Sequence, residues 1–294
     1  MIPLFDEASP HRDLQRACRE LGAFQWRLPP REAARLRETL RIATRFFARP
    51  SEEKRALDIG RSPHHRGYSE MHNERDWREQ LHLGREAPPL GDAGYLALVG
   101  PNQWPRDDAF RAAMLVHLEE TSALGLRLLD AIGLPFADPY LVMKLICYRP
   151  QPSNNATRPG VAAHVDYSLL TVLAQDELGG LDLRRADGRW VPVEPLPDTL
   201  LVNLGELVEA LTGGAMLATP HRVVNRSRSS ARVSIPVFVN PALDAVIAPR
   251  PRAPRRDAEH VHRVLDESPR PFVFGDREWQ RKGKNVWCKL CCAS

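Results

Sequence analysis

A series of short apolar segments separated by turn residues constrains the fold of this chain more than any other feature. Glycine, proline and aspartate residues interrupt these segments every few positions between residues 141 and 239. Many short strands in succession are typical of antiparallel sheets that pack face to face in a jelly roll. Strands are predicted at residues 141–148, 169–174, 181–183, 190–193, 200–204, 222–224 and 232–239, with a short helix at 205–211.

Helical patterns dominate the first third of the chain. Apolar residues recur at helical spacing in residues 14–21, 31–47 and 108–134, and Ser51 before two glutamates predicts the N-cap of a further helix. The longest pattern ends at Gly133 and should form a scaffold helix behind the sheets. The predicted fold class is therefore mixed α/β with a mainly β core. It is a double-stranded β-helix (jelly roll) with an N-terminal helical region and a long scaffold helix.

These patterns divide the chain into three regions that we expect to form one structural unit. Residues 1–135 form an N-terminal region of helices and loops that packs on the barrel. Residues 136–250 form the jelly-roll core, and residues 251–294 form a C-terminal extension. Within the first region, residues 64–80 are polar and aromatic without clear periodicity, which predicts a loop.

Two histidines and an aspartate in the core region form a candidate metal site. His164 and Asp166 are separated by one residue, so a strand would project both side chains to one side, and His221 could join them from a distant strand. Two imidazoles and one carboxylate leave coordination positions open, which is typical of non-haem Fe(II) oxygenases. A structural zinc site needs four protein ligands, and no fourth suits this place. The alternative interpretation is a polar strand edge.

Arg232 and Ser234 follow His221 and are also separated by one residue, so both project from the same strand face. The planar guanidinium of arginine suits bidentate binding of a carboxylate, and a serine hydroxyl can add a further hydrogen bond. An anion site of this kind beside a metal triad suits a dicarboxylate whose other end chelates the metal.

The whole segment resembles the iron- and 2-oxoglutarate-dependent dioxygenases, in the group that includes isopenicillin N synthase. The N-terminal match is looser, because Arg27-Leu28-Pro29-Pro30 stands where the family usually has asparagine-histidine-glycine. The matching motifs in the core are His164-Val165-Asp166, Leu170-Thr171, Gly179-Gly180-Leu181, Asp187-Gly188-Arg189-Trp190-Val191, Val202-Asn203-Leu204-Gly205, His221-Arg222-Val223-Val224-Asn225 and Arg232-Val233-Ser234-Ile235-Pro236.

The resemblance implies a metal, a cosubstrate and a reaction. The expected cofactors are Fe(II), held by the triad, 2-oxoglutarate, held through its distal carboxylate by the Arg232 and Ser234 pair, and O2. The expected reaction is oxidation of a small molecule, with hydroxylation as the default and release of succinate and CO2. By the same resemblance, Tyr148 helps to bind the cosubstrate carboxylate, with packing in the barrel wall as its alternative role.

The resemblance also makes Arg66 and Tyr68 candidate substrate residues, since the family's matching Gly-Tyr loop reaches over the iron. Arg66 would hold a substrate carboxylate and Tyr68 an apolar group; the alternative is a surface loop with the tyrosine packed in the core. The arginine-rich surroundings of Arg66 favour a carboxylate-bearing small molecule.

Two alternative functions stay open at the level of the sequence. One is an oxidase like isopenicillin N synthase, which uses the same iron and keeps an Arg-x-Ser pair without using 2-oxoglutarate. The other is a non-enzymatic metal or ligand sensor that uses the barrel as a binding module. Stoichiometric formation of succinate would separate the dioxygenase from both.

Charge and composition exclude several other classes. The net charge of +4 comes from arginines spread among acids along the whole chain, which does not predict a nucleic-acid partner. The one concentrated basic patch, between residues 250 and 256, is rich in proline and predicts a surface loop. No apolar run approaches the ~18 residues of a membrane span, so no membrane partner is expected.

The cysteines favour a cytoplasmic protein. There are five of them, an odd number, and three lie at the extreme C-terminal end as Cys288, Cys291 and Cys292. This pattern does not predict a disulfide framework, and a reducing cytoplasm fits it best. The terminal cysteines have no partner pair nearby in the sequence, so a disordered tail is expected rather than a metal site.

Overall fold

The computed structural model describes residues 2–151, 158–251, 265 and 270–291, with side chains in the last helix placed as far as Gly283. The basic segment at residues 252–256 and the last cysteine, Cys292, lie outside the described residues. None of the described helices is long and apolar enough to cross a membrane.

The first half of the chain contains four strands and two long helices. Its elements are β1 (Leu4–Phe5), α1 (His11–Glu20), β2 (Ala23–Arg27), α2 (Pro30–Phe47), α3 (Ser51–Arg55), η1 (Ile59–Arg61), β3 (Gly67–His72), β4 (Trp77–Gly84), η2 (Gly94–Leu98) and α4 (Asp108–Ala131).

The second half is mainly β. Its elements are β5 (Tyr140–Tyr148), β6 (Val161–His164), β7 (Leu170–Gln175), β8 (Leu181–Arg184), β9 (Trp190–Pro192), β10 (Thr199–Leu204), α5 (Glu206–Leu211), β11 (His221–Val223), β12 (Arg232–Asn240), β13 (Val246–Ile247), β14 (Phe272–Val273) and α6 (Phe274–Cys291).

Two sheets form the core. The major sheet has eight strands in the order β1-β2-β10-β7-β12-β5-β4-β3, and the minor sheet has four in the order β6-β11-β8-β9. All pairs within these sheets are antiparallel except β1 with β2. This arrangement confirms the predicted jelly-roll fold class, and the predicted strands of the core all occur within one or two residues of their expected ends.

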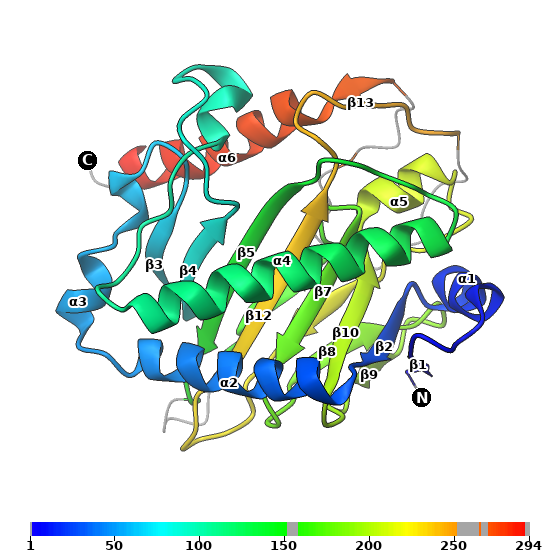
Figure 1. Ribbon diagram of the computed structural model, residues 1–294, viewed down its shortest axis with the longest axis horizontal. Helices are drawn as coiled ribbons and strands as arrows, with labels where there is room; N and C mark the ends of the chain where they lie inside the picture. The colour runs from blue at the N-terminus through cyan, green and yellow to red at the C-terminus, as the bar shows by residue number, and fades with distance from the viewer. Residues whose placement is uncertain (1, 152–157, 252–264, 266–269, 292–294) are drawn as a thin grey trace.

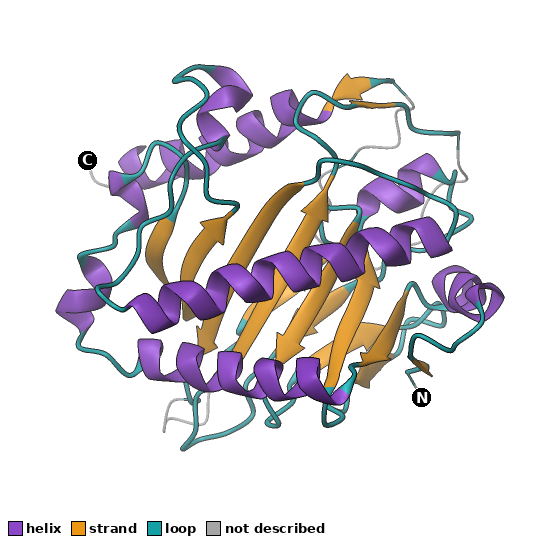
Figure 2. Cartoon of the chain, viewed as in Figure 1, coloured by secondary structure: helices purple, strands orange, loops and turns teal. Residues whose placement is uncertain are grey.

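The two faces of the major sheet have different environments. Helices α2 and α4 cross one face, as Figures 1 and 2 show, and Leu145, Val172 and Ile235 point from the sheet into that apolar layer. A second and smaller apolar cluster, including Leu173 and Leu201, lies on the opposite face together with residues of the minor sheet. We call this opposite face the inner face.

The N-terminal region is part of the same sheet. Strands β1 and β2 extend one edge of the major sheet, and β3 and β4 form a hairpin on the other edge. The prediction of a loop at residues 64–80 is therefore wrong. The side of the hairpin that faces the helices carries Glu70 and Glu79 beside Tyr68 and Leu81, so the sequence shows no simple alternation of apolar and polar positions.

Two predictions, one about the start of a helix and one about the C-terminal tail, need correction. Ser51 is the first residue of α3, and the preceding Pro50 occupies the N-cap position without a side-chain hydrogen bond. The C-terminal tail is not irregular as far as it is described, because α6 continues from Phe274 to Cys291 and includes the backbone of Cys288 and Cys291.

Candidate metal centre and cosubstrate site

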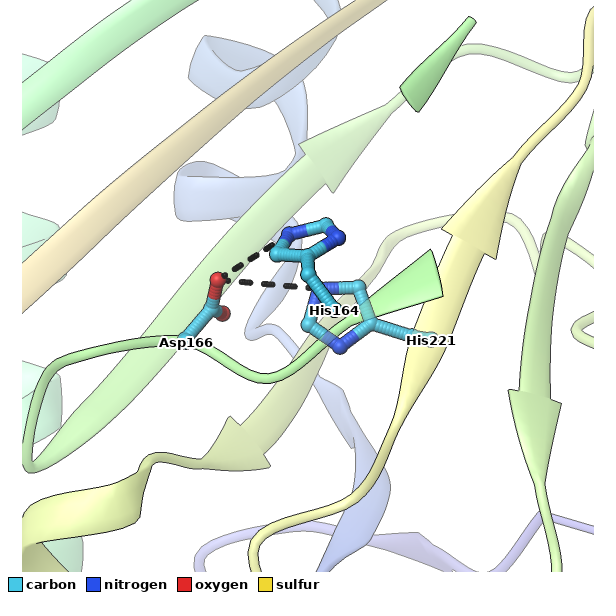
Figure 3. Close-up of side chains that lie close together, drawn as sticks. All are labelled: His164, Asp166 and His221. Atoms are coloured by element: carbon cyan, nitrogen blue, oxygen red, sulfur yellow. Dashed lines mark ion pairs between the residues drawn. The ribbon is translucent and has the colours of Figure 1, made fainter. Parts of the chain in front are cut away.

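The structure brings His164, Asp166 and His221 together between the two sheets. His164 is the last residue of β6, His221 is the first residue of β11, and the two residues are paired across these strands. Asp166 lies just beyond the end of β6, so it does not share a strand with His164 as the spacing predicts. Each of the three residues nevertheless offers a ligand atom within 4.8 Å of the other two (Figure 3).

Backbone carbonyls orient both imidazoles. His164 Nδ1 lies 2.9 Å from the carbonyl oxygen of Ala162, and His221 Nδ1 lies 3.0 Å from that of Thr219. Because a carbonyl oxygen can only accept, Nδ1 carries the proton in each ring and Nε2 keeps its lone pair. The two Nε2 atoms are 3.5 and 3.6 Å from Oδ1 of Asp166, so three ligand atoms converge on one point.

The carboxylate of Asp166 is held from the major sheet. Its Oδ2 accepts a hydrogen bond of 2.6 Å from the Thr171 hydroxyl on β7 and one of 2.9 Å from the Asn203 side chain on β10. Both residues lie in motifs that match the dioxygenase family, but the sequence alone assigns no role to either residue. A side chain that fixes a ligating carboxylate usually matters for metal affinity.

The protonation states suit a cation. Burial raises the pKa of Asp166, but His221, His164 and the hydrogen bonds outweigh it and hold this pKa well below its ordinary value. Burial lowers the pKa of His221, with partial opposition from Asp166. The site therefore offers one carboxylate and, at His221, a neutral imidazole, which is the form that binds a metal ion.

An anion site lies near the other end of β11. Arg232 is fully buried, its Nε donates to the carbonyl of Gly179, and its Nη2 donates to Gln175 Oε1 at 2.9 Å. Its Nη1 has no hydrogen-bond partner among the described residues, although it is buried. The guanidinium carbon lies 4.8 Å from the ring centroid of Tyr148, the residue paired with Arg232 across β5 and β12.

The spacing of the two sites suits a short dicarboxylate. Arg232 donates to the carbonyl of Gly179, and the carbonyl of the next residue, Gly180, accepts a hydrogen bond from the N–H of Val224. Val224 directly follows β11, and His221 is at the opposite end of that strand. The two ends of a three-residue strand are about 7 Å apart. The unpaired Nη1 and the nearby Ser234, which is also buried, are hydrogen-bond donors of the kind that one carboxylate of such a molecule would need.

The triad is the only group of three or more potential ligand side chains within the described parts of the chain that could hold a metal ion. With three protein ligands, the remaining positions of an octahedral ion stay available to other groups. The donor set therefore fits Fe(II) with a chelating cosubstrate, and it does not fit a closed structural site.

The two candidate substrate residues point in different directions. Tyr68 lies on the helix side of the hairpin, where its ring is 6.5 Å from that of Phe46 and its hydroxyl donates to Glu79 and Glu70. Arg66 instead occupies the space that a Cβ at Gly84 would fill, on the inner face of β4. The structure therefore brings Arg66, and not Tyr68, to the face that carries the triad.

Three further polar residues on the inner face were missed from the sequence. Gln80 and His82 alternate with core residues on β4, and Lys144 lies opposite His82 on β5. The signal for Lys144 was a charged residue within an otherwise apolar strand.

Comparison with known proteins gives a consistent result. Residues 139–241 match the 2OG-Fe(II) oxygenase superfamily, and residues 5–107 match the family described as non-haem dioxygenase in morphine synthesis N-terminal. The chain is 32% identical over 271 residues to a 2-oxoglutarate-dependent dioxygenase of Gibberella zeae, a match that covers 79% of this chain and 70% of the relative.

Two other similarities extend over most of the chain. Homoarginine-6-hydroxylase 2-ODD-C23.1 of Arabidopsis thaliana is 29% identical, with coverage of 81% of this chain and 78% of the relative. The crystal structure of a full-length Neurospora crassa protein in complex with alpha-KG and thymine has the same fold, with a TM-score of 0.78 at 22% identity over 97% of each chain.

Proposed function

Because the chain belongs to the 2-oxoglutarate- and Fe(II)-dependent oxygenase superfamily, we propose that its inner face is the active site of a small-molecule hydroxylase. His164, Asp166 and His221 bind Fe(II). The convergence of three ligand atoms within 4.8 Å of one another carries this assignment. Arg232, Ser234 and Tyr148 hold the distal carboxylate of 2-oxoglutarate.

The chain's own residues position the reactants. Bound Fe(II) and 2-oxoglutarate supply the activation of O2, with succinate and CO2 as the coproducts. Arg232 fixes the cosubstrate through its unpaired Nη1, and the apolar cluster on the inner face keeps water from this part of the site. Thr171 and Asn203 hold Asp166 so that both imidazoles can share one ion with it.

The enzyme uses 2-oxoglutarate, and its substrate is a small molecule. The relatives are named as a 2-oxoglutarate-dependent dioxygenase and a hydroxylase, and these names do not favour either alternative function, the oxidase without 2-oxoglutarate or the non-enzymatic sensor. The Neurospora crassa structure holds thymine, and the Arabidopsis relative is named for homoarginine, so small polar molecules are substrates within this superfamily. Hydroxylation is the reaction that we propose.

The cytoplasm is the compartment that we propose. The cysteines described with their side chains, Cys18 and Cys147, are buried free thiols, which suit a reducing environment.

Anaerobic titration of the Fe(II)-loaded protein with 2-oxoglutarate tests the proposal. The weak visible charge-transfer band of the chelate should appear in the wild type and in Arg85→Gln, which changes an exposed arginine. It should be lost at the same cosubstrate concentration in Arg232→Ala. Iron binding without the band would support the oxidase, and the absence of iron binding, or unchanged iron binding in His221→Ala, would contradict the triad.

A further inference from the structure

Lys144 is a cation on the inner face that forms no ion pair with any described residue. It is half-buried on β5, and its ammonium group forms no hydrogen bond or ion pair with any described residue. Its nearest recorded contact is the ring of Phe238, whose centroid lies 5.1 Å from Nζ. A cation that is partly removed from water and has no ion-pair partner is costly, so proteins rarely keep one without a function.

Arg66 is a second such cation. It is 2% exposed, its Nη2 donates to the carbonyl of Leu98 at 3.3 Å, and its Nε and Nη1 have no hydrogen-bond partner among the described residues. Its guanidinium carbon lies 5.8 Å from the ring centroid of Tyr140, whose hydroxyl also has no partner there.

The last helix adds a third cation, Lys282, which like Arg66 lies beside Tyr140. Lys282 of α6 is 8% exposed, and its Nζ lies 6.0 Å from the Tyr140 ring centroid. Its nearest acid is Glu278, at 3.6 Å, but Glu278 already accepts two hydrogen bonds of 2.8 Å from Arg281. One carboxylate therefore serves two cations of α6, and it is not paired with Arg66 or Lys144.

These cations share the sheet face that holds the triad. A continuous row of paired residues crosses the major sheet from Asn203 through Thr171, Phe238 and Val142 to Gly84. The first two contact Asp166, and Arg66 covers the last. Residues paired across strands point to the same side, and Thr171 and Gly84 are three strand spacings apart, or about 14 Å. Lys144 contacts Phe238 partway along this row.

We propose that the substrate of this enzyme carries a carboxylate that binds between Lys144, Arg66 and Lys282, at the side of the triad that faces β4, β5 and α6. This inference rests on the proposed function, since it names the substrate class of the same site. It adds two anchoring residues, Lys144 and Lys282, and makes α6 part of the substrate site. The carboxylate would pair with Lys144 and Arg66, which form no ion pair with any described residue.

The titratable groups around the cluster respond to its positive charge. Burial opposes ionisation of Tyr140, yet Lys282 and Arg66 bring the pKa of its hydroxyl below its ordinary value. Burial and then Lys144, Lys282 and other cations hold the pKa of His82 well below its ordinary value. Both directions indicate an excess of positive charge on this part of the inner face.

Two unpartnered atoms on β4 add polar specificity. Gln80 Oε1 and His82 Nε2 are buried without hydrogen-bond partners among the described residues. The amide oxygen of Gln80 can only accept, so it calls for a hydroxyl or N–H group on the substrate. The expected substrate is therefore a carboxylate that carries at least one further polar group.

Equilibrium binding of matched acids and amides tests the carboxylate class. The protein is loaded with Mn(II) and saturating 2-oxoglutarate and titrated, at constant ionic strength, with acetate, butyrate and phenylacetate and with the three corresponding primary amides. Acetate is the bare functional group, so a site for any larger acid should admit it. The acids should raise the melting temperature and the amides should not, and inorganic phosphate serves as a comparison anion.

Single substitutions test whether the acids bind at Lys144 and Arg66. Lys144→Met and Arg66→Gln should each weaken acid binding roughly 10- to 100-fold, while the exposed Arg85→Gln should leave it unchanged. Without added acid, Lys144→Met should melt at a higher temperature than the wild type, because it removes an unpaired cation. A lysine with only a structural role would give the opposite shift.

Three results would overturn the proposal. They are equal binding of acids and amides, stabilisation by phosphate with none by the acids, and a destabilised Lys144→Met that keeps the wild-type preference. The Fe(II) and 2-oxoglutarate charge-transfer band, recorded on the same wild-type preparation, separates this outcome from failure of the proposed function. Acid preference without the band would leave the carboxylate site standing and reject the cosubstrate assignment.

Discussion

Thr171 connects the metal centre to the major sheet at the scale of single residues. Its hydroxyl donates to the Asp166 oxygen that faces away from the two histidines. Thr171→Val keeps the shape and removes this hydrogen bond. The affinity for Mn(II) should fall roughly tenfold, because the carboxylate loses part of its orientation.

Thr121→Val provides the matched control for this change, since Thr121 is equally buried but lies on α4. Competition with a fluorescent chelator measures both affinities. Equal affinities in the two variants would show that Asn203 alone is sufficient to hold Asp166.

The ionisation of Lys144 gives the site a dependence on pH. Burial and then neighbouring cations lower its pKa from 10.5 to about 7. A lysine whose pKa is lower in the folded state than in the unfolded state lowers the free energy of unfolding. This penalty is complete at pH values below the folded-state pKa and disappears as the pH rises towards the unfolded-state pKa. The stability advantage of Lys144→Met over the wild type should therefore be largest below pH 7 and decline towards pH 10. Thermal melts across this range measure it.

Acid binding should follow the same group. A bound carboxylate favours the protonated amine, so the affinity for phenylacetate should fall as pH rises above about 7 in the wild type but not in Lys144→Met. A parallel decline in both proteins would assign the effect to another residue. The charged and titratable groups that act on Lys144 from neighbouring elements are Arg78 and His82 of β4, Glu278, Arg281 and Lys282 of α6, and Asp166.

At the scale of elements, a buried ion pair fastens the β3–β4 hairpin to the helical layer. Lys54 of α3 donates to Glu79 of β4 and to the carbonyl of Phe47, and Glu79 also accepts from Tyr68. Lys54→Met leaves this carboxylate with only the more distant Arg149, whose Nε lies 3.9 Å from Glu79 Oε1, and should lower the free energy of unfolding by about 3 kcal/mol. Urea denaturation measures the loss.

The double variant Lys54→Met/Glu79→Met tests the origin of that loss. Removal of both charges leaves no unpaired ion, so the double variant should be more stable than the single one. A double variant that is less stable would mean that packing, and not the unpaired charge, accounts for the effect.

Some secondary-structure elements could be predicted from the sequence and others could not. Strands β7, β10 and β12 were predictable because one or both of their faces bury apolar side chains between turns. The β3–β4 hairpin was not, because Glu70 and Glu79 interrupt the apolar positions on its helix-facing side. Acidic residues that are buried by an ion pair or a hydrogen bond remove the alternation on which such predictions depend.

At the scale of the whole molecule, the three proposed metal ligands are held in place by both sheets. His164 and His221 belong to the minor sheet, whereas Asp166 is fastened to the major sheet through Thr171 and Asn203. The residue types and their spacing predicted that these three side chains lie together, and they do. The sequence could not show that Asp166 lies beyond its strand, because that position depends on hydrogen bonds from residues that are distant in sequence.

The alternation of side chains along β4 has a consequence for the evolution of this enzyme. Glu79, Leu81 and Leu83 face the helices, while Gln80 and His82 face the triad. Selection can therefore replace the second set to accommodate a new substrate without disturbing the first. Since β4 lies next to the edge strand β3, and the proposed metal ligands lie elsewhere, this strand is a natural place for lineages with the same chemistry to diverge in what they oxidise.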